Sequence, residues 1–214
     1  FPLQGVRIED KQEIGRNAGL SEAQIVDLDD RRFLIAVLQA TEGKGFEDIV
    51  RDWVLYSKDN FGNGGHPCLL DLCLVSRLDL NTPVNILNKL GYANCIAFPK
   101  RHGLEGNVFV APSKGLQWGE WIEGPHAVLA EEFVKQSIDP YEISQRYKRI
   151  SAQVYPAVLP ERRFLVHLLR RILKQEASGR NIVGQILQDH VGLIQGCHAN
   201  GSVREMSRYW PEIY

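Results

Sequence analysis

The segment at residues 159–175 (LPERRFLVHLLRRILKQ) carries the clearest helical period in this sequence. Its apolar side chains recur every three or four residues, at Phe164, Leu165, Leu168, Leu169, Ile172 and Leu173. This spacing places them on one face of an α-helix and predicts that the face packs against a core. The segment therefore predicts an amphipathic helix whose arginines lie on the side away from the core.

Comparable patterns predict helices along most of the chain. Residues 46–60 carry apolar side chains at helical spacing, and residues 66–78, with Pro67 in the first turn, are apolar almost all round, which predicts a buried helix. A third helix is predicted after Thr82 as its cap, with Gly91 as its left-handed stop. Helical patterns return at 126–138, 139–155, 159–178 and 181–195. The apolar run at 30–41 fits either a buried helix or a strand.

Residues 94–110 predict the one hairpin of the chain, as two short strands around a turn that contains glycine. The fold class is therefore mainly α with a small β-hairpin (α+β). A helix, a tight turn, a second helix and a hairpin also follow one another in a winged helix-turn-helix, and a helical C-terminal part comes after them. We expect an N-terminal part at 1–115 and a C-terminal helical part at 126–214, with a boundary near 112–125; the alternative is one continuous domain.

The composition is that of a folded soluble chain, with 44% hydrophobic and 24% charged residues. No apolar run approaches the roughly 18 residues of a membrane span, and the first residues lack the pattern of a signal peptide. Four cysteines at irregular spacing do not form a disulfide framework, which indicates a reducing compartment. We expect an intracellular protein, cytoplasmic or nuclear, with no membrane partner.

Positive charge gathers locally although the net charge is only -1. Between residues 140 and 175 the acids are Glu142 and Glu161, and the bases are Arg146, Lys148, Arg149, Arg162, Arg163, Arg170, Arg171 and Lys174. In the helix predicted at 159–175, Arg163, Arg170 and Lys174 are separated by seven and four residues and so form one line. Such a line could follow a phosphate backbone. The alternative is a solvated face, or one that pairs with the acidic N-terminal half.

Two further groups of side chains favour a nucleic-acid partner. Lys100 and Arg101 lie at the tip of the predicted hairpin, and Asn85, Asn88 and Lys89 lie on the outer side of the helix before it. These residue types contact phosphates and base edges. The sequence therefore predicts a non-enzymatic binding protein for DNA or RNA, without a cofactor or a metal. Other protein chains are a second class of partner, and a helical scaffold or interaction module is a further interpretation.

The stretch GNGGHPCLLDLC at 62–73 offers an enzymatic alternative. A thiol at a helix N-terminus is activated by the helix dipole, so Cys68 with His126 or His102 would suit a cysteine-dependent hydrolase. The apolar neighbours of Cys68 favour ordinary core packing instead. Cys68 and Cys73 lie about 140° apart around a helix, which does not suit one metal ion.

A second enzymatic pattern ends at the Glu-x-Lys of Glu42 and Lys44, preceded by Asp27 and Asp30. In metal-dependent nucleases such carboxylates hold Mg²⁺ and the lysine positions a water molecule. That chemistry needs a strand at 31–41. A helix with a solvated end is the alternative that we favour.

Overall fold

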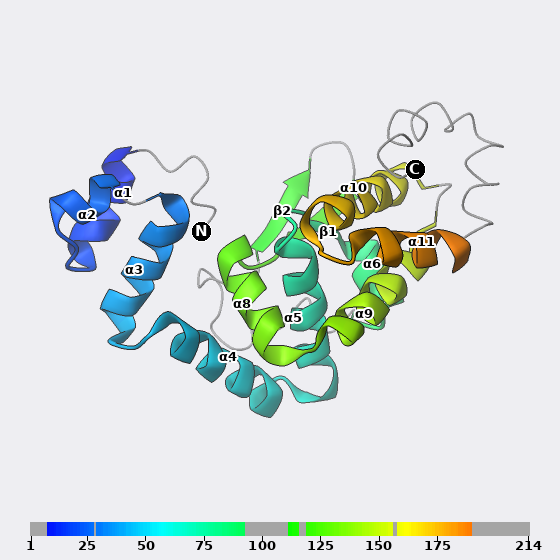
Figure 1. The fold of residues 1–214 in the computed structure, drawn as a ribbon, viewed down its shortest axis with the longest axis horizontal. Helices are drawn as coiled ribbons and strands as arrows, with labels where there is room; N and C mark the ends of the chain where they lie inside the picture. The colour runs from blue at the N-terminus through cyan, green and yellow to red at the C-terminus, as the bar shows by residue number, and fades with distance from the viewer. Residues whose placement is uncertain (1–7, 28, 93–110, 116–118, 156–157, 190–214) are drawn as a thin grey trace.

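The computed structural model describes residues 8–27, 29–92, 111–115, 119–155 and 158–189. Over these residues the chain is mainly helical with one small antiparallel sheet, as the sequence predicts. The helices are α1 (Ile8–Asn17), α2 (Glu22–Asp27), α3 (Asp30–Glu42), α4 (Phe46–Asn60), α5 (Gly62–Ser76), α6 (Val84–Lys89), α8 (Ala127–Ser137), α9 (Pro140–Ala152), α10 (Leu159–Gln175) and α11 (Gly179–Asp189) (Figure 1).

Helix α5 lies at the centre of the main core. It packs against α4, α8 and α9, and its side chains are buried nearly all round, which confirms the prediction of a buried helix. The predicted start was wrong, because α5 begins at Gly62 and Pro67 lies inside it. Proline at that position lacks an amide donor for the preceding turn, yet the burial of the surrounding leucines holds the helix together.

The sheet has the strand order β1-β3-β2, with β1 at Thr82–Pro83, β2 at Ala111–Gly115 and β3 at Gly119–Glu123. All pairs are antiparallel, and Ser113 lies opposite Trp121. This hairpin overlaps the stretch that the sequence predicts as the boundary near 112–125. The predicted hairpin at 94–110, with Lys100 and Arg101, lies outside the described residues.

Helices α1, α2 and α3 pack around a separate, smaller cluster (Figure 1). Ile25 and Phe33 are its buried members. Gly15 permits the close approach of α1 and α2, since a Cβ there would lie 2.5 Å from the Ile25 side chain. The run at 30–41 is helix α3, so the strand that the nuclease pattern needs is missing; Lys44 instead contacts Asp52 on α4 at 2.6 Å.

The main core contains buried residues from both sides of the predicted boundary at 112–125. Leu70 and Leu74 come from the first side, and Phe133, Tyr147 and Leu168 from the second. The division into two parts at this boundary stays a prediction. Within the described part of the chain, no helix is long and apolar enough to cross a membrane.

Candidate nucleic-acid interface

Helix α10 is amphipathic, as its sequence predicts. Phe164, Leu165, Leu168, Leu169 and Ile172 are buried in the main core, and Leu173 is partly buried against it. The last turn of α10 meets α11 closely, because a Cβ on Gly179 would lie only 2.3 Å from the carbonyl oxygen of Ile172. These contacts fix the rotation of α10 about its axis, and they leave one face outward.

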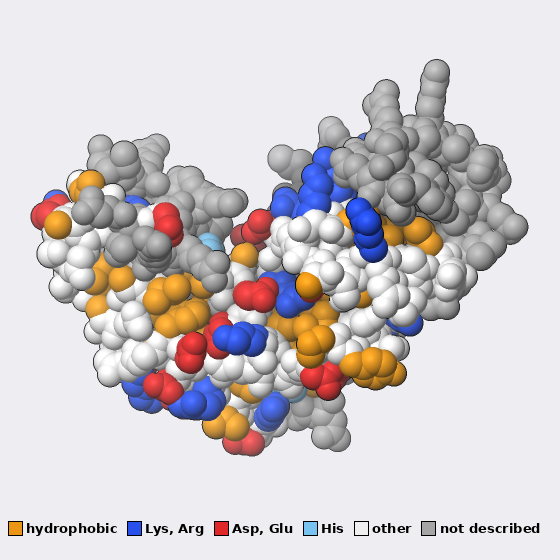
Figure 2. Space-filling view, viewed as in Figure 1, with side chains coloured by type: hydrophobic (Ala, Val, Ile, Leu, Met, Phe, Trp, Pro, Cys, Tyr) orange, Lys and Arg blue, Asp and Glu red, His pale blue; other side chains and the backbone are white. Residues whose placement is uncertain are grey.

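The outward face of α10 is basic. Its permanently charged members are Arg163, Arg170, Arg171 and Lys174, and His167 lies between them. At 3.6 residues per turn, all five side chains lie within an arc of about 100°. His167 and Lys174 are exposed, and the three arginines are partly exposed. Figure 2 shows Lys and Arg side chains gathered over α10. We call these five residues the α10 basic face.

The imidazole of His167 lies among the arginines of the basic face. Its pKa lies below the ordinary value of 6.5, mainly because of partial burial and then because of the positive charges of Arg170, Arg171 and Arg163. The three arginines stand at i+3, i+4 and i−4 from His167, where helical side chains are neighbours. The sequence analysis did not single out His167 or Arg171 as site residues, although this spacing was visible.

An acidic side chain borders the basic face at Arg171. The Nη1 atom of Arg171 lies 3.7 Å from Oδ2 of Asp79, and the two side chains are 41% and 48% exposed. Asp79 stands in the turn after α5 with φ 54°, a left-handed backbone conformation. Sequence analysis gave no signal for this contact, because 92 residues separate the two in the chain.

Helix α6 holds the predicted base-reading side chains. Asn85 and Asn88 are exposed. Lys89 has a structural role, since its Nζ donates to both carboxylate oxygens of Glu161, at 2.8 and 2.6 Å, and to the carbonyl oxygen of Gln153. Glu161 is buried about 160° around α10 from the line of Arg163, Arg170 and Lys174. Lys89 therefore reaches a different side of α10 from the basic face.

Other charged groups of the chain are enclosed by the fold. Asp71 on α5 is 1% exposed and accepts hydrogen bonds from Tyr92 Oη and Arg146 Nη1, both at 2.7 Å. Burial raises the pKa of Asp71 despite the opposing effect of Arg146 and Tyr92. The Nε of Arg146 also donates to Glu142 at 3.0 Å. This arrangement connects α5 with α9 and with the segment after α6.

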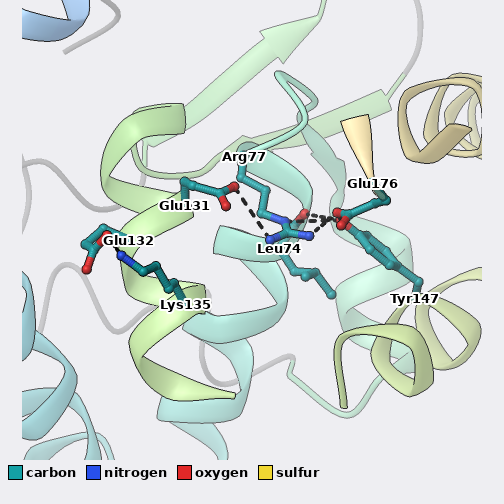
Figure 3. Close-up of polar contacts among 7 residues, drawn as sticks. All are labelled: Leu74, Arg77, Glu131, Glu132, Lys135, Tyr147 and Glu176. Carbon is teal, nitrogen blue, oxygen red and sulfur yellow. Dashed lines mark hydrogen bonds and ion pairs between the residues drawn. The ribbon is translucent and has the colours of Figure 1, made fainter. Parts of the chain in front are cut away.

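A second enclosed group surrounds Arg77 at the end of α5 (Figure 3). Its guanidinium forms ion pairs with Glu176, after α10, and with Glu131 on α8 at 3.5 Å. The hydroxyl of Tyr147 donates to Glu176 at 2.9 Å. Burial is the main cause that raises the pKa of Tyr147. Burial opposes the charged form of Arg77, but Tyr147, Glu176 and Glu131 outweigh it and raise the pKa of Arg77. The arrangement connects α5, α8 and α9 to the end of α10.

The residues of the cysteine alternative lie in the fold as follows. Cys68 and Cys73 are buried, as predicted. Because α5 begins at Gly62, Cys68 stands in the second turn, away from the helix N-terminus that would activate a thiol. Burial strongly raises the pKa of Cys73. His126 caps α8, and its Nδ1 accepts from the Val128 amide at 3.3 Å. His102 lies outside the described residues.

Sequence analysis did not identify the contact between His66 and Ser57. Ser57 Oγ lies 2.6 Å from His66 Nδ1 and donates to the Val54 carbonyl at 2.8 Å, so the ring nitrogen supplies the proton between them. The His66 ring also lies 5.9 Å from the ring of Phe133. Ser57 is buried, which gives this pair a structural role between α4 and α5.

No protein-family model matches the chain, and comparisons with curated proteins and with solved structures find no match either. Among the residues that the structure describes, no group of three or more His, Cys, Asp or Glu side chains could hold a metal ion.

Proposed function

We propose that this chain is a non-enzymatic nucleic-acid-binding protein that contacts the phosphate backbone through the α10 basic face. The observation that carries the proposal is the arrangement of Arg163, Arg170, Arg171 and Lys174, which lie within one arc on the outward side of α10 and are exposed or partly exposed. Four permanent positive charges within one arc of a helix produce a local positive potential although the chain has a net charge of -1. A polyanion is attracted by that local potential.

Ion pairs at this surface would compete only weakly with a phosphate backbone. Exposed pairs contribute about 0–1 kcal/mol each, and salt screens them. A nucleic acid instead releases condensed counterions from several phosphates at once, which favours binding at low salt. The basic face can therefore bind a nucleic acid even where single arginines have acidic neighbours.

The chemistry of the face favours binding without a sequence preference. Arginine, lysine and histidine are its polar groups, and it carries no Phe, Tyr or Trp ring, the larger aromatic surfaces on which unpaired bases stack. A DNA duplex carries one charge per about 1.7 Å of its axis and so attracts such a face strongly. We propose double-stranded nucleic acid as the partner, with the predicted wing at 94–110 and its Lys100 and Arg101 as a second backbone contact.

The test is charge reversal of the line Arg163→Glu, Arg170→Glu and Lys174→Glu in the full chain. Binding to a labelled duplex of about 20 base pairs is measured by fluorescence anisotropy at about 50 mM salt. We expect the reversed chain to lose binding while its thermal melt stays cooperative, because these side chains lie outside the core. Unchanged affinity would contradict the proposal, and simultaneous loss of folding and binding would support a scaffold role for α10.

A control variant separates the basic face from net charge. The control changes the net charge by the same amount with Arg16→Glu, Arg51→Glu and Lys135→Glu. All three side chains are exposed, at 58%, 60% and 64%. They belong to α1, α4 and α8. We expect this variant to retain most of the affinity. Equal losses in both variants would assign the effect to overall charge.

A further inference from the structure

We propose that Asp79 limits the affinity of the α10 basic face by occupying Arg171, so that a phosphate group must displace a carboxylate to reach that arginine. This inference rests on the proposed function and adds a residue that tunes it. Its first basis is the contact itself, 3.7 Å between Arg171 Nη1 and Asp79 Oδ2. A carboxylate and a phosphate oxygen bind a guanidinium in the same way, so the two compete.

The second basis is the backbone of Asp79. Its φ of 54° makes it the only residue other than glycine with a positive φ among those that the structure describes. Aspartate tolerates this conformation better than most residues, but glycine adopts it without a steric penalty. The turn would therefore accept glycine on conformational grounds. What aspartate adds at this position is a carboxylate beside Arg171.

The position of Arg171 makes this carboxylate effective. Arg171 stands at one edge of the basic face, about 80° from Arg163 and about 60° from Lys174 around the helix axis. Asp79 can therefore neutralise the edge, whereas Arg163, Arg170 and Lys174 lie on the other part of the face, away from this carboxylate. We infer that the wild-type chain binds through the line, and that Arg171 joins when Asp79 is removed or displaced.

The experiment compares the wild-type chain with Asp79→Asn and Asp79→Gly on the same duplex over a series of salt concentrations. Asparagine keeps the side-chain shape and its tolerance of positive φ, whereas glycine also relieves the backbone. For both we expect affinity to rise two- to fivefold at low salt, since an exposed pair is weak. The slope of log K against log salt should steepen by about 0.9, the value for one more phosphate contact.

Two controls assign the gain to this contact. Asp52→Asn removes an equally exposed carboxylate, 50% against 48%, from an ion pair with Lys44 on α4, and we expect it to leave affinity within twofold of wild type. In an Arg171→Gln background, Asp79→Asn should no longer increase affinity. Thermal melts of each chain establish that it is folded.

Three results would contradict the inference. They are an unchanged affinity and slope in both Asp79 variants, an equal gain from Asp52→Asn, and a full gain in the Arg171→Gln background. In each of these cases the wild-type chain still binds the duplex, so the proposed function survives. Absence of binding by the wild-type and Asp79→Asn chains alike would overturn both proposals together.

Discussion

Arg171 on the basic face of α10 and the arginines enclosed around α5 and α9 all contact carboxylates, but Arg171 is partly exposed to solvent and the enclosed arginines are largely buried. On α10, Arg171 is 41% exposed and its acidic neighbour is at 3.7 Å. Inside the fold, Arg146 is 16% exposed and contacts Asp71, itself 1% exposed, at 2.7 Å. Arg171 is therefore accessible to solvent, whereas Arg146 holds elements of the fold together.

The two regions differ in the free-energy cost of removing the arginine from its ion pair with a carboxylate. A buried carboxylate that loses its arginine keeps its charge away from water, which destabilises the fold strongly. A surface carboxylate that loses its arginine is solvated by water at little cost. Mutations of single arginines should therefore divide into two classes, one that affects folding and one that affects binding.

The largest effect is expected for Arg146→Ala. In this variant Asp71 stays buried and keeps only the hydrogen bond from Tyr92 of the two described above. The free energy of unfolding should therefore fall by about 3–5 kcal/mol. Urea denaturation monitored by circular dichroism measures the change. Arg170→Ala is the matched substitution on the basic face, and we expect it to change stability by less than about 0.5 kcal/mol. Equal losses of stability in the two variants would end the distinction between the regions.

The next largest loss of stability is expected when an uncharged polar group is introduced into the core at Cys73. Cys73 is fully buried on α5, and Cys73→Ser would place an unpaired hydroxyl there at a cost of about 1–3 kcal/mol. Cys73→Ala separates this cost from the loss of the sulfur atom. Neither substitution should alter binding to a duplex, as measured at about 50 mM salt. A loss of binding with the fold intact would show that α5 contributes to the interface, and would contradict the separation of binding residues on α10 from structural residues on α5.

The buried thiols should also resist chemical labelling. Burial raises the pKa of Cys73 and removes it from reagents, and Cys68 is 3% exposed. We expect both to react with iodoacetamide far more slowly in the native chain than in urea, with mass spectrometry as the readout. Rapid labelling of native Cys68 would instead revive the hydrolase alternative.

The smallest effect concerns the pH dependence of stability. Burial, with Lys58 and Arg146, lowers the pKa of His66 below its ordinary value of 6.5, so the folded chain binds this proton less readily than the unfolded chain. Stability should therefore fall as pH decreases below about 6.5. His66→Gln should flatten the profile measured by thermal melts from about pH 7.5 to about pH 5.5. The pKa of His167 is also lowered, so His167→Gln should flatten the profile in the same direction, and a profile unchanged in both variants would contradict the assignment.

Regular helical spacing explains how much of this fold the sequence could predict. The buried face of α10 and the all-round burial of α5 follow from local patterns, and so does the stop at Gly91, whose φ is 86°. The hairpin of β2 and β3 could not be found this way. Its strands consist of residues such as Pro112, Lys114 and Gly119, so the pairing depends on tertiary contacts rather than on intrinsic strand preference.

The candidate site was predictable only in part for a similar reason. Arg163, Arg170 and Lys174 share one helix, so a wheel of 3.6 residues per turn placed them together. The role of Lys89 depends on Glu161, 72 residues away, and the contact of Asp79 with Arg171 is also long-range. Long-range pairings of charged side chains leave no periodic signal, so the sequence predicts a nucleic-acid contact for Lys89 rather than its ion pair with the buried Glu161.

The most direct test of the basic face is the salt dependence of binding after charge neutralisation. The chain with Arg163→Gln, Arg170→Gln and Lys174→Gln is compared with the wild-type chain on one duplex between about 50 and 200 mM salt. Three phosphate contacts at about 0.9 each predict that the slope of log K against log salt becomes shallower by up to about 2.7, with a cooperative melt retained. A slope equal to that of the wild-type chain would show that these side chains do not contact the backbone, and would contradict the division between binding and structural charges.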